Sequence, residues 1–187
     1  ATDHPDLVDA LRTRGRLLYK RDNFTEAESH LERSLTIGER TRPPLAFLSG
    51  LELARMWLMQ GRIDDARMAV QSAKDLLKTQ SGCLIALASQ LEAEISLAIG
   101  DTSAATALIR QIPDTTKRQI LTARIHIEDG KPDLALSELS YTADAHPREA
   151  ITVAVLKARA AHDARLPEAD MFLRDCLTQA ENSDSSY

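Results

Sequence analysis

Apolar residues recur along this chain at the spacing of an α-helix, in segments separated by short turn sequences. Between residues 6 and 20, Leu7, Val8, Leu11 and Leu18 follow one another at helical intervals, as one face of an amphipathic helix requires. No segment alternates β-branched and polar residues in the manner of a strand. The pattern predicts an all-α protein of ten helices joined by short loops.

The ten expected helices follow one another as five antiparallel pairs, and glycine or proline marks most of their ends. We expect pair one at 6–20 and from 24 to about 38, pair two from 43 to 60 and at 63–78, pair three from 82 to 99 and at 103–112, pair four at 115–129 and 132–145, and pair five at 147–163 and 167–179. Thr25, with Glu28 three residues on, is expected to form a capping box.

A short phrase recurs at the start of the second helix of each pair. It consists of a turn residue, any residue, a bulky or ring residue, two polar or small residues, and an alanine. The copies are 22–27, 61–66, 100–105, 130–135 and 164–169, and their alanines are 39, 39, 30 and 34 residues apart. A period of this size is typical of a helical solenoid, whose extended surface usually serves binding.

Composition favours helices and restricts the partners. Aromatic residues make up only 4% of the 187 residues, so alanine and leucine supply most of the apolar surface. The net charge of −5 argues against direct nucleic-acid contact. No apolar run approaches the roughly 18 residues that cross a bilayer, and no signal peptide is recognisable. Cys83 and Cys176 are expected to be reduced, partly buried thiols of a cytoplasmic protein.

The spacing within each pair resembles the tetratricopeptide repeat (TPR). In that family a small residue of the first helix packs against the alanine of the second, and a bulky apolar residue follows the alanine by four positions. Twelve residues before the alanines stand Gly15, Ala54, Ala93, Ala123 and Lys157, with Ala158 beside the exception. Four residues after them stand Leu31, Val70, Ile109, Leu139 and Leu173. The resemblance implies a right-handed superhelix of about five helix pairs. The early tryptophan of the family is absent, and its closing proline is matched only by Pro147.

The long, alanine-rich repeats also resemble the sensor region of MalT-like, LuxR-type bacterial transcription regulators. Residues 121–130 and 166–181 carry this resemblance. In those proteins an ATPase module precedes the repeats and a helix-turn-helix follows them. This chain has no Gly-x-x-x-x-Gly-Lys-Ser/Thr loop to bind phosphates. The resemblance implies that residues 1–187 are one repeat domain of a longer regulator, which senses a small effector or a protein partner, with self-association as a further option.

The TPR resemblance also places the first helices along a concave groove, with the residue after each small position pointing into it. These residues are Arg16, Arg55, Glu94, Arg124 and Ala158, and Arg12, Tyr19, Lys20, Met59, Gln90 and His162 flank them. Arginines suit bidentate recognition of carboxylate or phosphate, so the groove is a candidate ligand or peptide site. Solvated charges, or partners of the acidic second helices, are the alternative explanation of this pattern.

Other reactive residues fit structural roles better. His126 and Asp129 share a helix face, but no third ligand stands at metal-binding spacing, which favours a polar helix end. No nucleophile elbow or cysteine–histidine signature occurs, so we expect neither an enzyme nor a cofactor. Trp57 is expected to pack in the core or between repeats, with ligand stacking beside Arg55 and Met59 left open.

The alternative function is a general scaffold whose concave groove binds a peptide. The chemistry of the groove separates the two functions. A closed pocket near Arg55 and Trp57 would favour a small effector, whereas an open channel of spaced polar residues would favour a peptide.

Overall fold

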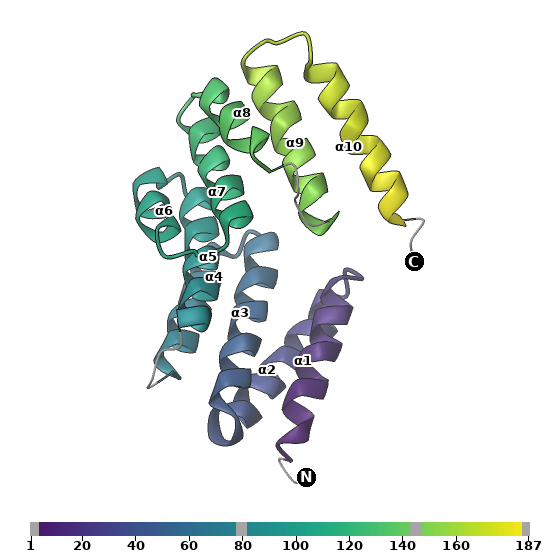
Figure 1. The fold of residues 1–187 in the computed structure, drawn as a ribbon. Coiled ribbons are helices and arrows are strands. Elements are labelled where there is room, and N and C mark those ends of the chain that lie inside the picture. Colours follow the sequence, from purple (N-terminus) through teal and green to yellow (C-terminus); the bar gives the residue numbers. More distant parts are fainter. Residues whose placement is uncertain (1–3, 78–81, 143–146, 185–187) are drawn as a thin grey trace. The chain divides into compact units, whose positions relative to one another are not determined.

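The computed structural model describes residues 4–77, 82–142 and 147–184, and within them the backbone forms ten α-helices and no strand (Figure 1). The helices are α1 (Asp6–Tyr19), α2 (Phe24–Thr41), α3 (Pro43–Met59), α4 (Ile63–Asp75), α5 (Gly82–Ala98), α6 (Thr102–Ile109), α7 (Thr115–Glu128), α8 (Pro132–Ser140), α9 (Pro147–Asp163) and α10 (Ala169–Asp184). The prediction of an all-α fold is confirmed. None of the described helices is both long enough and apolar enough to span a bilayer.

The chain divides into two compact units, Ala1–Ala98 with α1–α5 and Ile99–Tyr187 with α6–α10. In the first unit each helix packs on the next, and α3 also touches both α1 and α5. In the second unit α6 to α10 follow the same scheme, and α7 also touches α9. Neighbouring odd-numbered helices therefore share a face inside each unit, as a stack of helical hairpins requires. The core of the first unit lies around α3, where Phe47, Leu53 and Met56 are fully buried.

A left-handed residue ends the first helix of every pair. The residues with positive φ are Asp22 (59°), Gly61 (74°), Gly100 (80°), Gly130 (70°) and Arg165 (56°). At Gly61 the next backbone N–H, that of Arg62, donates to the Trp57 carbonyl at 2.8 Å, and the same bond recurs from Leu166 to Ala161 at 2.9 Å. This six-to-one bond is the Schellman ending of a helix. It gives each repeat a fixed point from which residues can be counted.

Counting from these turns corrects the register of the fifth pair. Seven residues before the left-handed positions stand Gly15, Ala54, Ala93, Ala123 and Ala158, which are all small. The residue equivalent to the others is therefore Ala158, and the assignment of Lys157 was wrong. The prediction failed because only three residues separate Arg165 from Ala169, whereas four separate each earlier turn from its alanine. As a consequence Arg159, and not Ala158, is the fifth equivalent of Arg16.

The predicted contact between the small residue and the second helix is confirmed in the first pair. In the first four pairs the predicted alanines and the apolar residues four positions later are also buried. A Cβ added to Gly15 would lie 2.6 Å from Leu31 Cγ and 3.1 Å from the Ala27 carbonyl oxygen, so only glycine fits. The second-helix alanines up to position 135 are fully buried, and the apolar residues four positions later are at most 6% exposed. In the fifth pair this prediction was wrong, because Ala169 is half-buried and Leu173 is 52% exposed.

Several helix ends differ from those predicted. α2 continues to Thr41, past its expected end at about 38, and Gly38 lies inside the helix where it closely approaches Ala46 and Val8. Asn23 caps α2 in place of Thr25 by accepting the Glu26 N–H, and Asp101 caps α6. The second helices of pairs two and four end earlier than expected, at Asp75 and Ser140, and their predicted ends at 78 and 145 lie outside the described residues.

Candidate functional site

Three of the predicted groove residues come together on the first helices of pairs one and two. Arg16 and Tyr19 lie on α1, and Arg55 lies on the adjoining α3. Tyr19 is half-buried, and this burial, together with the Glu52 carboxylate, raises the pKa of its phenol above the usual 10.0, whereas Arg55 and Arg16 lower it. All three charges therefore act on one phenol. We call Arg16, Tyr19, Glu52 and Arg55 the Tyr19 cluster.

The arginines of this region differ in how they are neutralised. Arg12 donates to Asp9 Oδ1 at 2.8 Å, and its side chain is only 15% exposed. Its Nε is buried and lacks a hydrogen-bond partner. Arg16 and Arg55 are half-buried and form no ion pair with any residue that the structure describes. Arg16 and Arg55 are therefore two half-buried cations of this face that can still receive a negatively charged group.

The other predicted groove residues of the first unit have local roles. Met59 is 62% exposed at the end of α3. Gln90 donates to Glu94 Oε1 at 3.0 Å, so these two half-buried side chains of α5 satisfy one another. This pairing lies within α5, so it differs both from a free groove position and from the pairing with an acidic second helix that the alternative explanation names.

Two predicted residues, Arg124 on α7 and His162 on α9, belong to the second unit. Arg124 is half-buried, and His162 is exposed beside a cavity of about 290 Å³ between α9 and α10. The sequence pattern missed Arg159, which lines the same cavity and reaches Glu128 on α7 with an Nη2–Oε1 distance of 3.1 Å. Arg159 is located by counting back from the left-handed turn at Arg165. The sequence does not mark this turn with a glycine.

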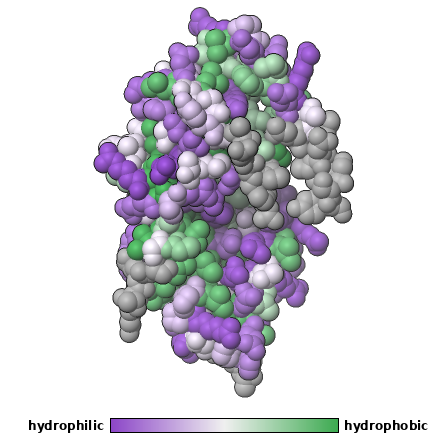
Figure 2. Space-filling model, in the orientation of Figure 1, coloured by the Kyte–Doolittle hydropathy of each residue, from purple (hydrophilic) through white to green (hydrophobic). Residues whose placement is uncertain are grey.

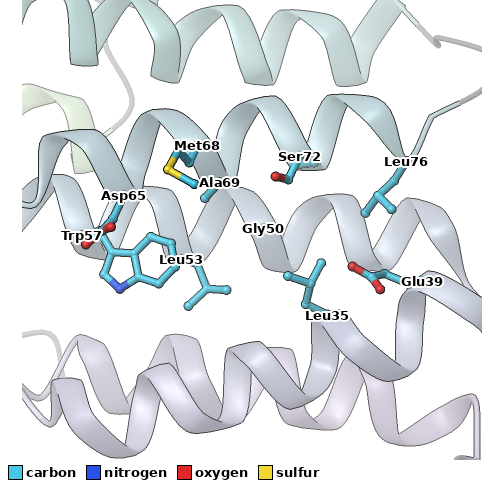
Figure 3. A pocket seen from close by; sticks show the side chains of 11 residues that line it. Leu35, Glu39, Gly50, Leu53, Trp57, Asp65, Met68, Ala69, Ser72 and Leu76 are labelled. Atoms are coloured by element: carbon cyan, nitrogen blue, oxygen red, sulfur yellow. The ribbon is translucent and has the colours of Figure 1, made fainter.

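A second concave feature, which the sequence did not predict, lies between the second helices α2 and α4. This groove has a volume of about 240 Å³ and is floored by Gly50, Leu53 and Trp57 of α3. Figure 3 shows Trp57 and Asp65 at one end and Leu76 and Glu39 at the other. We call it the α2–α4 groove.

A polar network closes one end of the α2–α4 groove. The Trp57 indole N–H donates to Glu28 Oε1 at 2.9 Å, and Arg62 donates to both oxygens of the same carboxylate at 3.0 and 3.2 Å. The Arg62 guanidinium also donates to Asp65 at 2.7 Å and lies 4.9 Å from the centre of the Trp57 ring. Bonds to Asp65 and Glu28 raise the pKa of Arg62 above its usual value. Glu28 therefore links repeats instead of completing the predicted capping box.

Trp57 packs between repeats, as expected, but it does not share a pocket with Arg55. Trp57 packs with the core residues around Ala27 and Leu31, and its ring lines the α2–α4 groove. Two positions along a helix correspond to a rotation of about 200°, so Arg55 points to the opposite side of α3. The pocket near Arg55 and Trp57 that would favour a small effector is therefore not formed by these two residues.

The remaining reactive residues in the described part of the chain do not converge on a site. Asp129 accepts from Thr102 and Lys131, and these bonds lower the pKa of its carboxyl below 3.8. Nδ1 of the neighbouring His126 is buried without a hydrogen-bond partner. Among the described residues no three His, Cys, Asp or Glu side chains are placed to hold a metal ion. Both cysteines are free thiols, but Cys83 is exposed, contrary to the expectation of partial burial, while Cys176 is half-buried.

Known structures with similar folds support the repeat architecture. Two crystal structures of the nearly identical TPR-like repeats assigned to a kinesin light chain of Podosopora anserina match this chain at 20% identity. One of them, of a point variant, gives a TM-score of 0.68 over 99% of this chain and 100% of that one, and the other gives 0.66 over 97% and 99%. No curated protein sequence matches the chain. The TPR-like solenoid fold predicted from the repeats is confirmed.

The family is shown by a match to residues 3–183, which are nearly the whole chain. The matching family model describes the MalT-like TPR region. This result agrees with the degenerate repeats and with the small residues that precede each left-handed turn. The chain belongs to the family of MalT-like TPR regions.

Proposed function

We propose that this chain is the signal-sensing region of a LuxR-type, MalT-like transcription regulator and that it binds an anionic effector at the Tyr19 cluster. The observation that carries the proposal is the pair Arg16 and Arg55, two half-buried cations on neighbouring helices without ion-pair partners among the described residues. A carboxylate or phosphate between them would gain charge-assisted hydrogen bonds. Tyr19 adds a neutral hydroxyl that can donate to the same group.

The ligand must also bind one arrangement of the helices better than another, or it cannot transmit a signal. Arg16 and Arg55 lie on α1 and α3, two helices that touch. A ligand held by both side chains favours the spacing of α1 and α3 that lets both arginines reach it. Binding can in this way select one packing of the first unit. The proposal assigns no catalytic role and no cofactor to this chain.

The test is a thermal-shift screen of small carboxylates and phosphorylated metabolites, followed by calorimetric titration of any compound that stabilises the chain. Arg16→Ala and Arg55→Ala should each weaken binding about tenfold or more, since a hydrogen bond to a charged group contributes about 1.5–3 kcal/mol. The double variant Arg33→Ala/Arg67→Ala removes two exposed arginines of α2 and α4 and is the control.

Three outcomes would contradict the proposal. Binding that survives the loss of Arg16 and Arg55 would place the effector elsewhere. A screen without hits, combined with arginine-dependent capture of an acidic peptide, would favour the scaffold function. A full-length polypeptide without an upstream phosphate-binding loop and a downstream helix-turn-helix would contradict the regulator assignment.

A further inference from the structure

The α2–α4 groove has the chemistry of a recognition site, although it lies apart from the Tyr19 cluster. Leu53 and Trp57 form its floor, and Leu35 and Met68 stand at its sides. The Met68 side chain is 69% exposed, so a large flexible apolar group is held in solvent at the rim. Tryptophan and methionine are enriched where proteins bind one another. Figure 2 shows hydrophobic residues exposed beside hydrophilic ones over the first unit.

The two charged residues that line the groove are both acidic. Asp65, at one end, is already neutralised by its 2.7 Å bond to Arg62. Glu39, at the other end, is exposed and forms no hydrogen bond or ion pair with the described residues. An incoming group with a positive charge therefore finds an unpaired carboxylate at the Glu39 end and an apolar surface between the two ends.

The dimensions of the groove favour a segment of polypeptide. Asp65 to Leu76 cover three turns of α4, which gives a length of about 16 Å. The volume of about 240 Å³ exceeds the cavity of about 150 Å³ that holds one benzene molecule, but it falls short of the roughly 300–1,000 Å³ that enclose a drug-sized ligand. One or two large side chains fit, while the backbone that carries them stays outside.

We propose that the α2–α4 groove binds a short segment of a partner protein, in which a large apolar side chain stands near a lysine or arginine. The apolar side chain packs on Leu53 and Trp57, between Leu35 and Met68, and the cation pairs with Glu39. These two places are about one to two helical turns apart along the groove. At about 3.3 Å per residue, an extended segment spans this interval in two to four residues.

Trp57 supplies the readout, because it is the only tryptophan of the chain and it lines the groove. The probes are eight-residue peptides without tryptophan or tyrosine, each with a leucine or phenylalanine and, two to four residues away, a lysine, a glutamine or a glutamate. We expect a saturable change in Trp57 emission with the lysine peptides. Their affinity should exceed that of the glutamate peptides about two- to fivefold, as for an exposed ion pair.

Three variants of exposed residues locate the site. Glu39→Gln should remove the preference for lysine without abolishing binding. Ser72→Arg, which fills the groove and offers its own cation to Glu39, should weaken binding at least tenfold. Glu32→Gln removes a carboxylate of α2 outside the groove and is the matched control. Circular dichroism checks that each variant keeps its helices.

Three results would overturn the proposal. One is the absence of a saturable emission change with every peptide up to millimolar concentration. A second is a change that Ser72→Arg leaves unaltered, or a preference for glutamate. The third is self-association of the chain in sedimentation experiments that Ser72→Arg abolishes, because the groove would then receive a second copy of the chain.

Discussion

The second helices of the first and last pairs carry the same apolar pattern but bury it to different extents. In α2, Ala27 and Leu31 are fully buried, whereas in α10 the corresponding Ala169 is half-buried and Leu173 is largely exposed. α2 packs against both α1 and α3, but among the described helices α10 touches only α9. A helix of a repeat array cannot bury its whole stripe against one neighbour.

The turn before each helix adds a second difference. Ala27 is the fourth residue of α2, and the helix places it against Gly15 of α1. Ala169 is the first residue of α10, and it follows Arg165 after one residue fewer. One residue rotates a helix position by about 100°. Ala169 therefore differs from Ala27 both in the number of helices around it and in its spacing from the preceding turn.

The largest expected effect comes from truncating the leucine that stands four positions after the alanine, which is Leu31 in α2 and Leu173 in α10. Leu31→Ala should lower the free energy of unfolding by about 2–5 kcal/mol, because it leaves a cavity between α1, α2 and α3. Leu173→Ala should lower it by less than about 0.5 kcal/mol, because most of that side chain is already in solvent. Urea unfolding of the two variants measures both values. Equal losses would show that α10 is as well packed as α2.

Enlarging the alanines tests the same contrast from the opposite side. Ala66 of α4 is fully buried in the core that α4 shares with α3. Ala66→Leu should therefore destabilise the chain by about 1–3 kcal/mol through overpacking. Ala169→Leu should change stability by about 0.5 kcal/mol or less, since α10 leaves space around this position. Thermal and urea unfolding distinguish the two variants. A neutral Ala66→Leu would contradict the repeat register.

Substitutions at the left-handed turn residues should change the free energy of unfolding by about 1 kcal/mol, as a loss at Gly61 and a gain at Arg165. Gly61 has no atom within 4 Å of an added Cβ, so Gly61→Ala should cost about 1–2 kcal/mol through its positive φ alone. Arg165 adopts the same conformation without being glycine, and Arg165→Gly should stabilise the chain by up to about 1 kcal/mol. Unfolding midpoints measure both variants. A destabilising Arg165→Gly would show that its side chain makes a contact that outweighs the strain.

Much of the fold could be predicted because the repeat pattern and the packing requirement coincide. Gly61, Gly100 and Gly130 mark their turns in the sequence, and the fully buried alanines follow them at a fixed distance. Asp22 and Arg165 occupy the same conformation without a glycine, so the sequence does not show that Arg165 is a turn residue. The error over Ala158 and Arg159 follows directly from this missing signal.

The candidate sites were less predictable for a different reason. The repeat register taken from the TPR resemblance selected Arg16, Tyr19 and Arg55 as candidates, because all three depend only on the register of α1 and α3. The α2–α4 groove depends on how three helices pack, because its sides come from α2 and α4 while Gly50 on its floor lets α3 approach Ala73 of α4 closely. A Cβ on Gly50 would lie 2.9 Å from the Ala73 Cβ. A sequence read one helix at a time contains no signal for such a distance.

The smallest expected effect on stability comes from the carboxylate of Asp129 at the turn after α7. The turn after α9 has no carboxylate at the equivalent position. Asp129 precedes the left-handed Gly130, and its counterpart before Arg165 is Ala164. Hydrogen bonds from Thr102 and Lys131 lower the pKa of Asp129 below 3.8, so the folded state favours the ionised carboxylate. This contribution is fully present above the unfolded pKa near 3.9 and is lost as the pH falls through the lower folded value.

Asp129→Asn should therefore reduce stability at pH 6 more than at pH 3, by less than any of the changes above because the carboxylate is exposed. Urea midpoints of the wild type and the variant, measured between pH 6 and pH 3, give the difference at each pH. Asp133→Asn removes another exposed carboxylate from the same part of the chain and is the control. A difference between wild type and Asp129→Asn that stays constant across this range would mean that Thr102 and Lys131 do not favour the ionised carboxylate. The charge would then contribute nothing to the contrast between the two turns.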